Sequence, residues 1–384
     1  MTQDTRATIQ LAKDFLSKLK RYSVIVEKRD SMTEPISASL GTEEIAARFG
    51  LTMMEISNRR YLGSKQKLLR SIEMAIRGQL GRLPTSLVDS FAGSGVVAAY
   101  FADRGVPVVA NDLLAHNSIA LETFLLHSRY DFESLCHLLV ELQNLAGRDG
   151  YVSATFGGKY FSVQNAAKLD AMRDFLDDQV EDDALRQAAV TSLIYAADKV
   201  AQTVGHYDAF FNRESVEKPL LLRAPKIIGD GSSHSVMNQD ANLLVRQIQA
   251  EVNFQDPPYN SRQYSSNYHV LENIALWQKP EVKGVSAKMD LNAVASKYCT
   301  RSASEAYQDL VENCDSDLIA LTYSNTASQR VSRSNNLLTD GDINRILGGF
   351  GTMKTIEVDH KEFSVGKTSD REHKERIFLA KRGS

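Results

Sequence analysis

The sequence predicts an α/β domain in which a large, mainly helical insertion interrupts the sheet. The segment SLVDSFAGSG, residues 86–95, is a short apolar strand that enters a glycine-rich turn, and a helical segment and a second strand, VPVVAND, follow it. Strand, helix and strand in this order predict a βαβ unit. Residues 113–225 have mainly helical patterns. Strand-like segments then return at residues 234–241, 252–259, 317–325, 354–360 and 376–382.

The composition is ordinary for a soluble globular protein, with 43% hydrophobic and 24% charged residues. The 384 residues are enough for one large domain with an insertion or for two domains. No apolar run is long enough to span a membrane and the first residues lack the pattern of a signal peptide, so we expect a cytoplasmic protein without a membrane partner. The net charge of −3 excludes a uniformly basic nucleic-acid binder but not a local basic face. None of the 3 cysteines lies in a CxxC pair, so we expect no metal site.

Helical patterns dominate the chain before the first strand. Residues 8–30 repeat apolar side chains on one helical face. Residues 42–57 resemble two short helices around a glycine turn, which is compatible with a helix-turn-helix motif or with plain helical packing. An amphipathic helix is expected to start at Ser64, whose hydroxyl can cap it, with Leu68 and Ile72 on its apolar face.

The glycine turn after the first strand predicts a site for a cofactor that contains adenosine. Gly93 and Gly95 allow a tight turn and let a ligand approach the backbone N–H groups. Asp112, at the end of the second strand, is suited to accept hydrogen bonds from ribose hydroxyls. A nicotinamide cofactor and S-adenosylmethionine both need these features, and a tight turn without any ligand is a further alternative.

The segment FQDPPYNSRQY, residues 254–264, favours methyl transfer to an adenine amine. Two consecutive prolines stiffen the chain between Asp256 and Tyr259. The Asp256 carboxylate and the Pro257 carbonyl can accept the two amine hydrogens, which frees the nitrogen lone pair, while Tyr259 stacks on the base. A base in a duplex must be flipped out to reach such a site. Methylation at cytosine C5 would need a cysteine after a proline, and the chain has no Pro-Cys pair.

With the segments RRYLGSKQKLL, VDSFAGSGVVAAYF and QDPPYNSRQYSSNYHVLENIALW, the chain resembles the Dam-like family of DNA adenine-N6 methyltransferases. The resemblance covers roughly residues 58–384 and is greatest to FokI-type restriction–modification methylases. It implies an S-adenosylmethionine-dependent methyltransferase fold, which is Rossmann-like, with a mixed, mostly parallel sheet. It further implies site-specific methylation of adenine N6 in double-stranded DNA, with S-adenosyl-L-methionine as cofactor and a cognate restriction endonuclease as a functional partner.

The resemblance also implies roles for segments and residues. Residues 1–57 lie outside the resemblance and are expected to form a helical extension without an assigned role. The resemblance makes 58–125 the cofactor-binding half of the catalytic domain, 126–235 the helical insertion and target-recognition region, and 236–384 the catalytic half. In GHYDAFFNR, His206, Tyr207 and Arg213 are expected either to contact DNA or to pack at a helix end. The expected catalytic residues are Asp256, Pro257 and Tyr259, and the expected cofactor-binding residues are Tyr61, Lys65, Asp89, Phe91, Gly93, Gly95, Asp112, Asp240 and Asp256.

Three other functions compete with this hypothesis. One is methylation of RNA adenine or of a protein amide, although amide methylation usually goes with asparagine at the position of Asp256. A second is a nicotinamide-dependent oxidoreductase, which leaves the Asp-Pro-Pro-Tyr segment without a role. The third is a DNA-binding protein with an inactive methyltransferase fold, which the complete set of motif residues disfavours.

Overall fold

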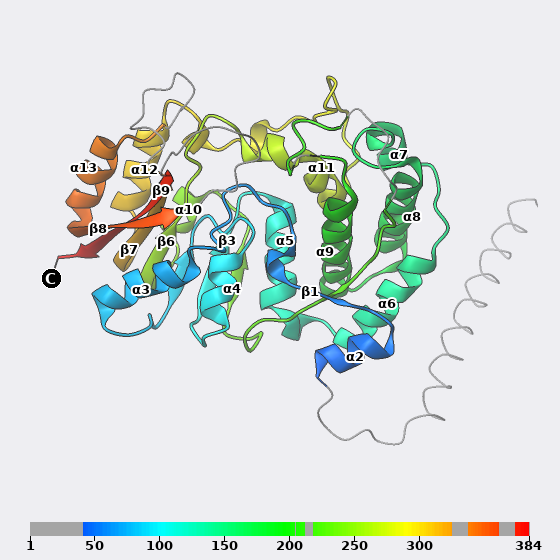
Figure 1. Cartoon of the computed structure of the whole chain (residues 1–384), viewed down its shortest axis with the longest axis horizontal. Helices are drawn as coiled ribbons and strands as arrows, with labels where there is room; N and C mark the ends of the chain where they lie inside the picture. The colour runs from blue at the N-terminus through cyan, green and yellow to red at the C-terminus, as the bar shows by residue number, and fades with distance from the viewer. Residues whose placement is uncertain (1–40, 204, 212–217, 325–336, 361–372, 384) are drawn as a thin grey trace, which may run out of the picture. The chain divides into compact units, whose positions relative to one another are not determined.

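A computed structural model of the protein describes residues 41–203, 205–211, 218–324, 337–360 and 373–383 (Figure 1). The helix expected at residues 8–30 and the side chain of Arg213 lie outside these described residues. The residues from Thr42 onward form one compact unit.

A seven-stranded sheet with the strand order β5-β3-β2-β6-β7-β9-β8 forms the centre of the fold. All neighbouring strands pair in parallel except β9, which runs antiparallel to both β7 and β8. This mixed, mostly parallel sheet confirms the expected Rossmann-like α/β fold. The strands are β2 (Leu87–Asp89), β3 (Val108–Asn111), β5 (Ser235–Met237), β6 (Gln249–Gln255), β7 (Asp315–Ser324), β8 (Gly351–His360) and β9 (His373–Arg382).

Helices cover both faces of the sheet, because apolar side chains alternate between the faces along each central strand. On β7, Leu318 and Ala320 join the core under α3 and α4, whereas Ile319 and Leu321 join the core under α12 and α13. Figure 1 shows α3 and α13 on opposite sides of β9. These helices are α3 (Leu69–Leu80), α4 (Val96–Ala102), α10 (Ala241–Leu244), α12 (Ala303–Glu312) and α13 (Asp340–Phe350).

The segment between β3 and β5 is mainly helical, as expected, and its helices α5 and α9 pack against each other and against α11. Its longer helices begin at residues whose side chains cap the first turn: Asp131 accepts from the N–H of Ser134, and Asp182 from that of Leu185. These helices are α5 (Ala115–Leu125), α6 (Phe132–Asn144), α7 (Tyr151–Phe156), α8 (Val163–Gln179) and α9 (Asp183–Val200), with α11 (Tyr264–Leu276) from the later part of the chain; the 3-10 turns η2 (His127–Arg129), η3 (Asn292–Val294) and η4 (Lys297–Cys299) lie in connecting segments.

Residues 42–57 form one helix rather than two. After α2 (Thr42–Arg48) and the turn at Gly50, the chain forms β1 (Met53–Met54) and the 3-10 turn η1 (Ile56–Asn58). The reason is a distant partner: β1 pairs in parallel with β4 (Ala224–Pro225), which satisfies its backbone groups. The helix-turn-helix interpretation of this segment is therefore wrong.

The helix expected from Ser64 begins at Leu69 instead. A turn precedes it, in which the N–H of Leu68 donates to the carbonyl of Lys65. From this turn the Lys65 side chain reaches Asp256 across the fold. Tertiary pairing here overrides a local capping signal.

Candidate active site

A cleft lies at the carboxyl ends of β2, β3 and β6, where ligands bind in open α/β sheets. Its empty volume is about 890 Å³, part of which is open to solvent. Segments far apart in the sequence meet here, since the wall includes residues 61–65, the glycine turn and the residues after β6. Of the residues expected in the site, those that line the cleft are Tyr61, Lys65, Asp89, Phe91, Gly93, Asp112, Asp240 and Asp256; Gly95, Pro257 and Tyr259 are not among the lining residues.

The two glycines of the turn have different surroundings. Gly93 has φ +54°, and a Cβ atom there would lie 2.7 Å from Cε1 of Tyr61. Gly95 has φ +82° and is the N-cap of α4; a Cβ there would lie 2.6 Å from Leu121 and 2.7 Å from Ile56, in the core. Gly93 thus allows Tyr61 to form the cleft wall, whereas Gly95 lets the core pack against the turn.

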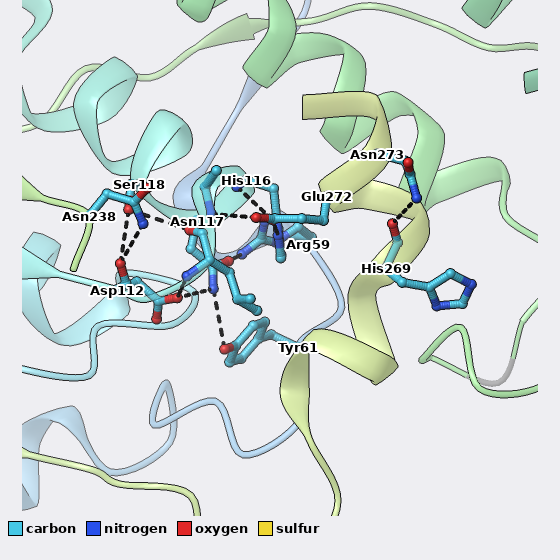
Figure 2. A network of polar contacts seen from close by, with 12 residues as sticks. Arg59, Tyr61, Asp112, His116, Asn117, Ser118, Asn238, His269, Glu272 and Asn273 are labelled. Atoms are coloured by element: carbon cyan, nitrogen blue, oxygen red, sulfur yellow. Dashed lines mark hydrogen bonds and ion pairs between the residues drawn. The ribbon is translucent and has the colours of Figure 1, made fainter. Parts of the chain in front are cut away.

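Asp112 is held by three hydrogen bonds from the protein. Oδ2 accepts from the N–H of Gly93 at 2.8 Å, and Oδ1 accepts from the N–H of Leu114 at 2.8 Å. Oδ1 also accepts from Nδ2 of Asn117 at 2.9 Å (Figure 2). Burial raises the pKa of this carboxyl, and the three donors oppose that effect. Because a carboxylate offers about four acceptor positions, room for a further donor remains.

Asp89 ends β2 and is 1% exposed. Its Oδ1 has no hydrogen-bond partner among the described residues, although the residue lines the cleft. Burial, together with the negative charges of Asp256 and Asp112, raises the pKa of Asp89 to about 8. A buried carboxyl with a free oxygen is suited to a cationic ligand group, which would stabilise its ionised form.

Asp256 receives donors on both carboxylate oxygens. The Lys65 ammonium lies 2.7 Å from Oδ2, and Thr322 Oγ1 donates to Oδ1 at 2.9 Å. Lys65 also donates to the carbonyl of Gly63 at 2.8 Å and is 6% exposed. Burial lowers the pKa of Lys65, but the charges of Asp256 and Glu375 outweigh this and raise it. The cleft therefore contains an oriented ion pair at the residue expected to meet the target amine.

The remaining expected residues surround this ion pair. Pro257 is buried, and the next proline, Pro258, lines the cleft instead. The ring of Tyr259 packs edge-to-face against Tyr323, with 6.2 Å between centroids. Asp240 accepts from the N–H of Asn242 at 2.8 Å and so caps α10.

Sequence reasoning missed an aromatic stack beside the cleft. The ring of Tyr61 lies parallel to that of Tyr268, with 4.9 Å between centroids and 6° between planes, and Tyr264 packs at 5.8 Å. The Tyr268 hydroxyl accepts from the N–H of Leu62 at 2.7 Å. The spacing of Tyr264 and Tyr268, four residues apart on one helix, is the only signal that could have indicated a shared face.

Tyr207 is fully buried and donates to Asp198 at 3.3 Å. It therefore belongs to the packed helix end, the second of the two roles expected for this segment. His206 is partly exposed, and its ring Nδ1 accepts a hydrogen bond from the N–H of Asp208 at 3.3 Å.

Residues 61–334 match the model of the D12 class N6 adenine-specific DNA methyltransferases. The chain belongs to this family. Type II methyltransferase M.NlaIII of Neisseria lactamica is 31% identical over 330 residues, which cover 82% of this chain and 95% of that protein. Modification methylase StsI of Streptococcus sanguinis is 32% identical over 78% of this chain, and type II methyltransferase M.FokI of Planomicrobium okeanokoites is 27% identical over 78%. The chain spans about half the length of these last two proteins, 47% and 48%.

As a member of the D12 class, the protein is an adenine-specific DNA methyltransferase with S-adenosyl-L-methionine as methyl donor. This confirms the expected enzyme class, cofactor and DNA substrate, and it disfavours the nicotinamide-dependent oxidoreductase. In the described part of the chain, no helix is both long enough and apolar enough to cross a membrane. Its three cysteines, Cys136, Cys299 and Cys314, are buried and form no disulfide.

Proposed function

We propose that the protein is a site-specific methyltransferase that modifies adenine N6 in double-stranded DNA, as the modification enzyme of a restriction–modification system with a cognate endonuclease. The observation that carries this proposal is that Asp256, oriented by Lys65 and Thr322, lines the same cleft as the glycine turn. The names of the relatives M.NlaIII, StsI and M.FokI support the restriction–modification context. In this proposal, residues 126–235 recognise the target, and 58–125 and 236–384 form the catalytic domain.

The cleft has features that fit S-adenosyl-L-methionine. The free Oδ1 of Asp89 suits the cationic amino group of the methionine part, and Asp112 keeps an acceptor position for the ribose hydroxyls. The absence of a side chain at Gly93 lets the Tyr61 ring pack against the glycine turn and form one wall of the cleft. We assign Tyr61, Lys65, Phe91 and Asp240 to the walls of this cofactor site, while Gly95 supports it from the core.

At Asp256, the protein provides acceptors for the amine of a flipped adenine. The carboxylate accepts one amine hydrogen at Oδ2 once Lys65 gives up part of its contact there, while Thr322 holds the other oxygen. The Pro257 carbonyl is the second acceptor, and Tyr259, held by Tyr323, stacks on the base. S-adenosyl-L-methionine, when bound, supplies an electrophilic methyl group. The protein thus contributes position and electrostatics rather than a covalent nucleophile.

The experiment that tests this function measures methylation directly. The protein is incubated with labelled S-adenosyl-L-methionine and mixed-sequence duplex DNA, and the DNA is digested to nucleosides. We expect labelled N6-methyladenine, and we expect structured RNA to compete poorly. Absence of methyladenine from every duplex, or preferential labelling of RNA, would contradict the proposal. Methylation-sensitive sequencing of a host that expresses the protein then identifies the site and the modified strands.

Gly93→Ala is expected to weaken S-adenosyl-L-methionine binding by at least about tenfold, because the new methyl group displaces Tyr61 from the cleft wall. Calorimetric titration measures this affinity. The left-handed backbone also costs about 1–2 kcal/mol of stability. Gly81→Ala is the matched control, since Gly81 has φ +76° but nothing within 4 Å of its Cβ position. It should lose similar stability and keep cofactor affinity; equal loss of affinity in both variants would contradict the assignment.

A further inference from the structure

Arg59 is a buried arginine that contacts Tyr61, a residue of the cleft wall, and Asn117, a partner of Asp112. It is 4% exposed, and its guanidinium carbon lies 5.5 Å from the ring centroid of Tyr61 and 5.7 Å from that of Tyr195. Its Nη2 donates to Oδ1 of Asn117, whereas Nε and Nη1 have no hydrogen-bond partner among the described residues. Arg59 also precedes the residues that match the family model, which begin at residue 61. A buried charge with so few hydrogen-bond partners lowers the stability of the fold, which raises the question of what Arg59 contributes to the cleft.

Arg59 determines which way the Asn117 amide points. A guanidinium can only donate hydrogen bonds, so the amide oxygen must face Arg59 and the amide nitrogen must face the opposite side. There Nδ2 donates to Oδ1 of Asp112 at 2.9 Å and to the Tyr61 hydroxyl at 3.4 Å (Figure 2). Arg59 at the oxygen end and Asp112 at the nitrogen end both favour this orientation, because a turned amide would place its oxygen against the Asp112 carboxylate. Without Arg59, only the contacts with Asp112 and Tyr61 hold the amide.

The backbone that carries Asn117 is held in place independently. Glu272 on α11 accepts from the N–H groups of Ala115 and His116, at 2.9 and 3.1 Å, and so binds the first turn of α5. The same carboxylate contacts Nδ1 of His116 at 2.6 Å (Figure 2). Because the helix start is anchored, rotation of the Asn117 side chain is the remaining freedom, and the Arg59 contact at the amide oxygen restricts it.

We infer that Arg59 is a positioning residue that acts through Asn117 on Asp112 and Tyr61, and thereby sets the selectivity of the cleft for a ligand with free ribose hydroxyls. The inference rests on the proposed function, in which Asp112 accepts hydrogen bonds from these hydroxyls. With the amide locked, Asp112 presents its remaining acceptor position in one direction. The Tyr61 hydroxyl, which accepts from Asn117, is left to donate its own hydrogen elsewhere.

The test compares binding of S-adenosylhomocysteine with binding of its 2′,3′-dideoxy analogue by calorimetry, so that no turnover is needed. We expect the wild-type protein to prefer the hydroxylated ligand by about tenfold or more. Arg59→Met and Asn117→Leu should lose most of this ratio, and Arg59→Lys, which keeps a donor and a charge, should retain part of it. Arg60→Lys is the matched control, because neighbouring Arg60 binds Asp198 and the carbonyl of Thr203 instead of the cleft. Its ratio should equal that of the wild type.

Asp112→Asn separates this inference from the proposed function. If Asp112→Asn loses the ratio and Arg59→Met keeps it, the inference is wrong while the ribose role of Asp112 stands. If Asp112→Asn keeps the ratio, the ribose role is wrong and the inference falls with it. If Arg59→Met does not fold, judged by circular dichroism, Arg59→Lys applies the test, and a ratio equal to that of the wild type would contradict the inference.

Discussion

Asp256→Ala is expected to reduce methyl transfer to DNA by about 10³-fold or more, because the acceptor that orients the adenine amine is removed. Single-turnover methylation with excess enzyme measures this step apart from product release. Binding of DNA, followed by fluorescence anisotropy, should remain close to that of the wild type. Normal methylation by this variant would show that the proposed mechanism is wrong.

The variant also changes stability, because Asp256 pairs with buried Lys65. Removal of one partner leaves the other charge buried and unpaired, which costs about 3–5 kcal/mol for fully buried pairs and less here, since the Asp256 side chain is 19% exposed. The double variant Lys65→Met with Asp256→Ala should recover much of this stability and none of the activity. Asp182→Ala is a further control, since it removes a helix cap worth about 1 kcal/mol at a site outside the cleft lining; it should lower stability without weakening cofactor binding.

Asp89→Asn is expected to weaken S-adenosyl-L-methionine binding by about 10²-fold and to stabilise the ligand-free protein by on the order of 2 kcal/mol at pH 8. The binding loss follows from the missing charge opposite the cationic amino group. The gain in stability follows because an amide in this buried position carries no ionisation penalty. Calorimetric titration and chemical denaturation measure the two effects.

The sign of the pH dependence follows from the raised pKa of Asp89, about 8 in the folded protein against about 3.9 in the unfolded chain. Between these values the folded state holds a proton that the unfolded state has lost. The contribution of Asp89 to the free energy of unfolding therefore falls as pH rises from about 4 to about 8, and it is constant above that. Cofactor affinity should rise with pH over the upper part of this window, with proton release on binding, and Asp89→Asn should show neither effect.

Asp170→Asn provides the contrast for this second prediction. Asp170 is also fully buried, but its oxygens accept from the N–H groups of Val152 and Ser153 and from the Ser153 hydroxyl. Its amide variant should therefore be destabilised and should bind the cofactor normally. If both amide variants lose stability, Asp89 has a partner in the folded protein and its assignment to the cationic group is wrong.

The parts of the candidate site that could be predicted are those formed by residues close together in the sequence. The βαβ unit places Asp89, Gly93 and Asp112 at the same edge of the sheet, because the carboxyl ends of neighbouring parallel strands lie side by side. The same rule brings Asp256 beside them, since β6 pairs with β2. The stiffness of the Asp-Pro-Pro-Tyr segment is likewise a local property of proline.

The partners of these residues could not be predicted, because they come from segments far away along the chain. Thr322 reaches Asp256 since the parallel register of β6 and β7 pairs Gln255 with Leu321, which places the next residues side by side. Lys65 fits the pattern of a helix start, whereas the structure begins the helix at Leu69 and pairs Lys65 with Asp256. In the same way, the contact of Gly95 with the core depends on α5 and η1, which no local pattern could indicate.

The sequence by itself thus determined the class of fold, the glycine turn, the stiff Asp-Pro-Pro-Tyr segment and the family, because each depends on residue types at short spacing. The tertiary structure alone decided which charges pair, which oxygen of the Asp89 carboxyl has no hydrogen-bond partner among the described residues, and which way the Asn117 amide faces. These properties depend on distances of a few ångströms between residues such as Arg59 and Asn117, which are 58 positions apart. Electrostatic and hydrogen-bond energies change steeply over such distances, and only the folded chain determines them.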